Sequence, residues 1–167
     1  YRDEGFSSEA LLNYLVRLGW SKGDQEIFSL EEMIDGFDLS GINKASAKFD
    51  IEKLRWVNQQ HLFNTNDDEL ILMIKAQSET AIGLNDETMK KFINAYKNRA
   101  HTINDLVFSC DSLFSDKINY DEASAEKFLK KEIISPLEDV VDSLRESDWN
   151  QESISEALKS VCEKHEI

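Results

Sequence analysis

The amino-acid sequence predicts an all-α protein. Apolar residues recur at intervals of three and four in one segment after another, and a helix-capping residue precedes most of these segments. No segment of the 167 residues shows the sustained two-residue alternation of a half-buried strand. Hydrophobic residues make up 41% of the chain and there is a single proline, so a packed helical core is expected.

The first expected helix ends at Gly19, where a residue in the left-handed conformation would close it. Leu11, Leu15 and Leu18 stand at positions i, i+4 and i+7, so they are expected to share one buried face. Asn13 falls in the polar stripe of the same helix. On this prediction, the change Leu15→Asp would unfold this part of the chain.

Capping residues mark the starts of the expected helices, because their side chains accept hydrogen bonds from first-turn N–H groups. The stretches 29–32 and 102–105 have the form of a capping box, in which an acidic side chain bonds back to the cap. Ser135 combines a cap with Pro136 at the first helical position. The predicted N-caps are Ser7, Ser29, Asp50, Asn66, Asn85, Thr102, Asp121, Ser135 and Asn150.

The stretch 62–66 is the best candidate for a domain boundary. Residues 1–62 hold about three expected helices, and residues 63–167 hold about five or six. Residues 41–49 lack helical periodicity and are expected to form an ordered loop. We therefore expect a short helical unit followed by a helical bundle.

The sequence contains no motif for nucleotide binding or metal chemistry. It has no GxGxxG, P-loop, HExxH or CxxC pattern, and its three histidines lack the spacing of metal ligands. Cys162 and His165 could form a thiol–imidazole pair by spacing, but a buried cysteine on an amphipathic helix is the favoured interpretation. No catalytic residue, metal or cofactor is expected in this chain.

The cysteines and the hydropathy of the chain indicate its cellular compartment and whether it enters a membrane. No apolar run reaches the roughly 18 residues that a membrane helix needs, and the first residues lack a signal-peptide pattern. The two widely spaced cysteines, Cys110 and Cys162, are typical of reduced thiols. We expect a monomeric cytoplasmic protein that does not contact membranes.

The net charge of −14 argues against a general binder of polyanions, because nucleic-acid affinity rests on lysine and arginine. Two windows, residues 41–66 and 89–104, are nevertheless locally basic. They are either solvated faces or RNA contacts, in which lysines contact phosphates and Tyr96, Arg99 or Asn98 contacts unstacked bases. The first window holds Lys44, Lys48, Lys53 and Arg55, and the second holds Lys90, Lys91, Lys97 and Arg99.

The amino-acid sequence of about the first sixty residues resembles that of bacterial glutamyl-tRNA synthetase just after its catalytic domain. The matching runs are DEGF, EALLNYL, LGWS, GDQEIFS, EEMI, FDL, NKASAKFD and KLRWVN. From Leu62 onward the chain is similar to the helical anticodon-binding region of that family, although more loosely. The step KNRAHT at residues 97–102 and the helix that follows Trp149 carry this second resemblance.

The resemblance implies a class I synthetase that joins glutamate to its tRNA with ATP and magnesium. The family's HIGH-like and KMSKR-like motifs are not present in this chain, so the chain alone is expected to be inactive. Residues 1–62 would be the stem-contact segment, and residues 63–167 would be an anticodon-binding domain that stops before the family's last small domain. The expected partners are the glutamate tRNA and the parent enzyme's own catalytic domain in cis.

The resemblance and the basic windows together suggest the RNA-contacting residues. Lys44, Lys48, Lys53 and Arg55 are expected to contact the tRNA stem, and Lys90, Lys91, Lys97 and Arg99 the anticodon arm. The alternative is an acidic helical module, derived from a synthetase, that binds a basic protein and no RNA.

Overall fold

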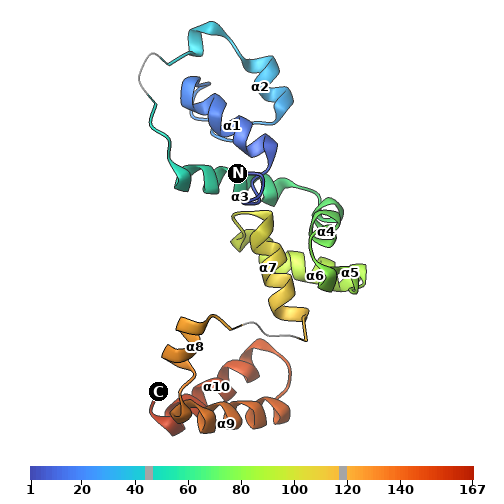
Figure 1. Cartoon of the computed structure of the whole chain (residues 1–167), viewed down its shortest axis with the longest axis vertical. Coiled ribbons are helices and arrows are strands. Elements are labelled where there is room, and N and C mark those ends of the chain that lie inside the picture. The colour runs from blue at the N-terminus through green and yellow to red at the C-terminus, as the bar shows by residue number, and fades with distance from the viewer. Residues whose placement is uncertain (44–46, 117–119) are drawn as a thin grey trace. The chain divides into compact units, whose positions relative to one another are not determined.

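The computed structural model describes residues 1–43, 47–116 and 120–167, and the regular elements among these residues are helices joined by loops (Figure 1). Within the described ranges no β-strand forms beyond one isolated bridge between Trp20 and Ile42, which confirms the all-α prediction. The elements are α1 (Ser8–Gly19), α2 (Leu30–Gly36), η1 (Leu39–Gly41), α3 (Ile51–Asn64), α4 (Asp67–Lys75), α5 (Glu79–Ile82), α6 (Asp86–Tyr96), η2 (Lys97–Arg99), α7 (Ile103–Phe114), α8 (Glu122–Phe128), η3 (Lys131–Ile133), α9 (Ile134–Glu146) and α10 (Gln151–His165).

The chain folds into two compact units, Tyr1–Ile118 and Asn119–Ile167, which we call unit 1 and unit 2. Each is considered by itself. The boundary predicted at residues 62–66 begins inside α3 and reaches the cap of α4, both within unit 1. Lys44, the first of the predicted stem-contact residues, lies outside the described residues.

The first half of unit 1 is built by α1 packing along α3. Phe6, Ala10 and Tyr14 from the start of the chain meet Leu54 and Val57 of α3 in a buried cluster. A second small cluster lies beside it, where the Trp20 and Phe28 rings are 5.6 Å apart and Met33 of α2 is buried. These two clusters fix α1, α2 and α3 relative to one another.

The predicted buried face of α1 is confirmed in part, because Leu11 and Leu18 are partly buried against the first cluster. The prediction is wrong for Leu15 and for Asn13. The Leu15 side chain is 50% exposed, whereas Asn13 is fully buried. Asn13 is buried because its amide is bonded on both sides. Its Oδ1 accepts hydrogen bonds from the Phe28 backbone N–H (2.9 Å) and from His61 Nε2 (2.9 Å), and its Nδ2 donates to the Glu26 carbonyl (3.0 Å).

The prediction for Gly19 is also wrong. Gly19 is the last residue of α1 and has no left-handed backbone, and the extended Trp20 ends the helix by donating its N–H to the Val16 carbonyl. A left-handed glycine occurs instead at Gly5, with φ of 84°. A Cβ at Gly5 would lie 2.7 Å from the Asn104 side chain, so only glycine lets the N-terminal segment approach the start of α7 this closely.

The second half of unit 1 has its own core, built from α4, α5, α6 and α7. Leu70 and Ile74 of α4, Met89 and Ile93 of α6 and Leu106 of α7 are each fully buried. Leu62, near the end of α3, belongs to this core as well. The α3 helix therefore contributes side chains to both halves of unit 1.

Local capping signals are confirmed at eight of the nine predicted sites, including the capping boxes at Ser29 and Thr102. The exception is Ser135, which lies inside α9 rather than before it. The short helix η3 runs directly into α9, so the helix begins at Ile134 and places Pro136 at its third position. Proline is tolerated there because first-turn N–H groups have no intrahelical partner.

Unit 2 is a small assembly in which α9 packs against α10. Among its described residues the buried side chains are Pro136 and Val161. Asp139 of α9 joins the two helices, because its Oδ2 accepts from Lys164 Nζ and His165 Nε2, each at 2.6 Å. These contacts hold the pKa of Asp139 below its usual value, with Lys164 the larger cause.

Candidate nucleic-acid interface

The two basic windows, far apart in sequence, meet inside unit 1 because α3 packs against η2. Gln59 Nε2 of α3 donates to the Asn98 carbonyl of η2 at 2.8 Å. Asn58, which is fully buried, donates from Nδ2 to the His101 carbonyl at 2.5 Å and accepts from the Ser7 N–H at 2.8 Å. The structure thus brings the predicted stem-contact helix and the predicted anticodon-arm segment side by side.

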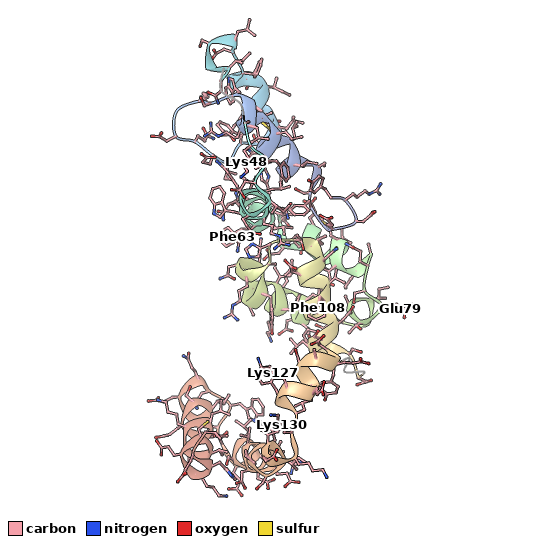
Figure 2. The ribbon with its side chains drawn as sticks, turned by 60° about the vertical axis from the view of Figure 1, so that its left-hand side comes forward. Lys48, Phe63, Glu79, Phe108, Lys127 and Lys130 are labelled. Atoms are coloured by element: carbon pink, nitrogen blue, oxygen red, sulfur yellow. The ribbon has the colours of Figure 1, made fainter. Side chains whose placement is uncertain are left out.

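Lys48, Lys53 and Arg55 of the first window differ in how far their charges are already neutralised. Lys48 is exposed ahead of α3 and has no ion pair among the described residues (Figure 2). Arg55 lies 3.7 Å from Glu52, but both side chains are more than half exposed, so this pair is weak. Lys53 Nζ lies 3.0 Å from Glu26 Oε2.

Glu26 is the centre of a three-residue ion cluster. The Arg17 guanidinium donates to both of its carboxylate oxygens, at 2.8 and 3.3 Å, and the Arg17 side chain is only 12% exposed. Arg17 is the main reason that the pKa of Glu26 lies below its usual value, and Lys53 adds to the effect. Lys53 therefore contributes to holding α3 against the segment after α1, and its charge is partly compensated.

The second window is less basic in space than in sequence. Lys90 of α6 pairs with Asp68 at 2.9 Å, which raises the pKa of Lys90, and Lys91 pairs with Glu87 at 2.7 Å. Asp68 belongs to the acidic first turn of α4, more than twenty residues earlier in the chain. The absence of acids from residues 89–104 thus does not translate into a free basic surface.

Lys97 is the most strongly engaged cation of this window. Its Nζ donates to the Thr65 carbonyl at 2.6 Å and to Asp67 Oδ1 at 2.8 Å, and its side chain is only 14% exposed. The same ammonium lies 5.9 Å from the centre of the Phe63 ring. Lys97 therefore ties η2 to the junction between α3 and α4.

Arg99, two residues further on, is exposed and has no ion pair among the residues that the structure describes. Its position is nevertheless fixed, because η2 is bonded to α3 through Gln59 and Asn98. The pairing pattern therefore separates the described site residues into three classes. Lys48 and Arg99 have no ion pair among the described residues, and Arg55 has a long, exposed one at 3.7 Å. The pairs of Lys53, Lys90, Lys91 and Lys97 are shorter, at 2.7 to 3.0 Å, although those of Lys90 and Lys91 are also more than half exposed.

A family model described as "Anticodon binding domain" matches residues 60–167. The chain belongs to the anticodon-binding domain family. A second model, "tRNA synthetases class I (E and Q), catalytic domain", matches residues 1–56 of the chain. The two matches meet within α3, the helix that contributes to both cores of unit 1.

The relatives are glutamate–tRNA ligases, which confirms the resemblance. The chain is 37% identical to the ligase of Nitrosomonas eutropha and 38% identical to the ligase of Nitrosomonas europaea. Each match covers all of this chain and 36% of the ligase. A solved glutamate tRNA ligase from Elizabethkingia meningosepticum, in complex with its amino acid, superposes with a TM-score of 0.73 at 31% identity, covering all of this chain and 34% of that one. The solved glutamate-tRNA synthetase from Elizabethkingia anophelis superposes with a TM-score of 0.65 at 32% identity, covering 98% of this chain and 32% of that one.

The chain thus spans about a third of the length of the curated relatives that it matches. The sequence analysis missed one further group of basic residues. It lies in unit 2, within the residues that the anticodon-binding domain model matches. Lys127, Lys130 and Lys131 are exposed and have no ion pair among the described residues. Figure 2 labels the first two of them. Their signal was visible in the run KFLKK, but the acidic surroundings of the second half of the sequence masked it.

Other features of the described structure are unsuited to holding RNA or a metal. A hollow of about 780 Å³ in unit 1 is lined by three carboxylates, Glu9, Glu32 and Glu69, which would repel phosphate. In the described ranges no group of three or more His, Cys, Asp or Glu side chains is arranged for a metal ion. No described helix is both long and apolar enough to cross a membrane.

The cysteine prediction needs correction. Cys162, expected to be buried, is exposed on α10. His165 Nε2 is bonded to Asp139 at 2.6 Å, and Asp139 is also held by Lys164. Cys110 is the buried cysteine, and burial raises the pKa of its thiol to about 11. A thiol with that pKa is almost entirely protonated near neutral pH and is a poor nucleophile.

Proposed function

We propose that this chain binds the glutamate tRNA and orients it for aminoacylation, as the RNA-binding part of a glutamate–tRNA ligase. The match of the anticodon-binding domain model to residues 60–167, beside a catalytic-domain match at residues 1–56, carries the proposal. In this proposal residues 1–62 contact the stem and residues 63–167 the anticodon arm. The joining of glutamate to tRNA, with ATP and magnesium, takes place on the catalytic domain in cis, and this chain alone is inactive.

The distribution of free charge supports the proposal. Lys48 and Arg99 are exposed, unpaired cations in the described part of the chain, and Arg55 is weakly paired. Arg55 lies on the α3 helix and Arg99 on the η2 segment that is bonded to it. Since the chain as a whole carries −14, a tRNA is attracted at few places and repelled elsewhere. Such a surface favours one orientation of the tRNA over many.

The paired lysines have a different role in this proposal. Lys53, Lys90 and Lys97 hold α3, α6 and η2 against acidic partners. Each of them can contact phosphate only by sharing or releasing a carboxylate, which costs part of the energy gained. We therefore assign the larger share of RNA affinity among the described residues to Lys48, Arg55 and Arg99. The contact predicted for Lys44 rests on the sequence alone, because Lys44 lies outside the described residues.

Titration of the chain with glutamate tRNA at two salt concentrations tests the proposal. We expect salt-sensitive binding, and we expect Arg99→Ala to weaken it and to lower the slope of log affinity against log salt by about one. Arg145→Ala is the matched control, because it removes the same charge from an exposed arginine that is paired with Asp142. If both variants lost the same affinity, the effect would be one of net charge and the assignment of Arg99 would be wrong.

The alternative remains an acidic protein-interaction module that binds no RNA. The net charge of −14 favours it, and the same titration separates the two functions. No binding of tRNA at low salt would support the alternative. We also propose a monomeric protein of the cytoplasm, where both unpaired thiols would stay reduced; sedimentation of the purified chain tests the monomer.

A further inference from the structure

The short helix α2 is apolar on two sides. Its inner side buries Met33 against Trp20 and Phe28. On its outer side Leu30, Ile34 and the following Phe37 stand at positions i, i+4 and i+7, and are 47%, 67% and 53% exposed. Leu39 of η1, 79% exposed, follows them in the chain. A helix that is apolar on both sides is normally covered on both sides.

An acidic row accompanies this apolar stripe. Glu31, Asp35 and Asp38 also stand at positions i, i+4 and i+7, one residue on from the stripe, and all are exposed. Hydrogen bonds from Ser40 and Gly41 lower the pKa of Asp38, and the nearby charge of Lys22 adds to the effect, but the three carboxylates outnumber this one lysine. An RNA backbone would be repelled here, and a second copy of the chain would bring two acidic rows together. The charge complement is a protein surface with an apolar ridge flanked by lysine or arginine.

The α2 face is also held in a fixed shape before any partner arrives. The capping box of Ser29 and Glu32 fixes the start of the helix, since each residue's side chain accepts a hydrogen bond from the other's backbone N–H. At the other end the Phe37 ring lies 5.9 Å from the buried Trp20 ring. A pre-organised apolar surface loses little conformational entropy when it is covered, which suits a permanent contact.

We propose that the outer face of α2, with Leu39, is the docking surface for the remainder of a class I catalytic domain in the same enzyme. The catalytic-domain family model matches residues 1–56, which include all of α2 and η1. The relatives are almost three times as long as the matched stretch, so they have further chain that could cover this face. This docking rests on the part of the proposed function that places a catalytic domain in the same enzyme, and it does not depend on which residues contact RNA.

Hydrogen exchange on a fused protein tests the proposal. The part of the Nitrosomonas eutropha ligase that precedes the matched stretch is joined in front of Tyr1, and exchange of the α2 amides is compared with that of the chain alone. We expect exchange in α2 to slow by at least about 10-fold in the fusion, because covering the helix suppresses local opening. Ile34→Asp should abolish most of that protection, while the chain alone with this change should keep its helicity.

Leu72→Asp is the matched control, since Leu72 is 69% exposed on α4, outside the catalytic-domain match. It should leave the protection of α2 intact. The proposal would be overturned if the α2 amides exchanged equally fast in the fused and unfused proteins. It would also be overturned if Ile34→Asp and Leu72→Asp removed the protection of α2 to the same extent. Concentration-dependent dimers of the unfused chain that Ile34→Asp removes would overturn it as well, since they would assign the face to a second copy. Titration of unfused Ile34→Asp with tRNA should match the parent chain; weaker binding would assign the face to RNA.

Discussion

The buried amide of Asn13 allows a test that separates the structure from the hydrophobic pattern of the sequence. The change Asn13→Leu removes three hydrogen bonds. The buried Phe28 N–H then has no hydrogen-bond partner, which costs about 2 kcal/mol of stability. The partly buried Glu26 carbonyl also loses its partner, which costs about 1 kcal/mol. Leucine is also larger than asparagine in a fully buried position, so added apolar burial is offset by overpacking. We expect the free energy of unfolding to fall by about 3 kcal/mol.

The companion variant is Leu15→Asp, two residues further along α1. The hydrophobic pattern predicts that it unfolds this part of the chain, whereas the structure leaves Leu15 half exposed and predicts a loss of about 0.5 kcal/mol. Urea denaturation followed by tryptophan fluorescence measures both, because Trp20 is buried beside Phe28 and reports unfolding of this region. The hydrogen-bond argument would be refuted if Asn13→Leu lowered the free energy of unfolding by less than about 1 kcal/mol. It would also be refuted if Leu15→Asp lowered it by more than about 1 kcal/mol.

Two further predictions concern titrating groups. Because the folded pKa of Glu26 lies below 4.5, its stabilising effect is present above pH 4.5 and is lost as pH falls through the folded value. Glu26→Gln should therefore lower stability near neutral pH, by about 1 kcal/mol, and flatten its dependence on pH in acid; an unchanged acid profile would contradict this. At pH 7.5 iodoacetamide should modify the exposed Cys162 far faster than the buried Cys110, as mass spectrometry would show.

Local signals in the sequence predicted the helix starts well, because a cap depends on residues within one turn of itself. Ser29 and Glu32 bond to each other whatever the rest of the chain does. The start of α9 was missed because the preceding η3 already has a helical backbone, so the helix does not need the cap at Ser135. That continuity depends on the packing of unit 2, which a cap motif does not encode.

The buried face of α1 could not be predicted from periodicity because polar partners decide it. Asn13 faces inward to bond Glu26, Phe28 and His61, which are 13 to 48 residues away in sequence. A pattern that scores only hydrophobicity counts asparagine as a surface residue, although a fully bonded amide is stable in a core. A leucine on the same helix is then left partly exposed.

The candidate RNA site was predictable in its composition but not in its charge. Residues 89–104 contain no acid, yet Asp67 and Asp68 of α4 lie against Lys97 and Lys90 because α4 and α6 pack together. Those aspartates stand in the first turn of α4, where the helix dipole favours negative charge. One feature therefore stabilises a helix start and pairs with two lysines, Lys90 of α6 and Lys97 of η2. The cations left free, above all Arg99 and Lys48, are the ones from which specific orientation of a polyanion on a −14 chain would have to come.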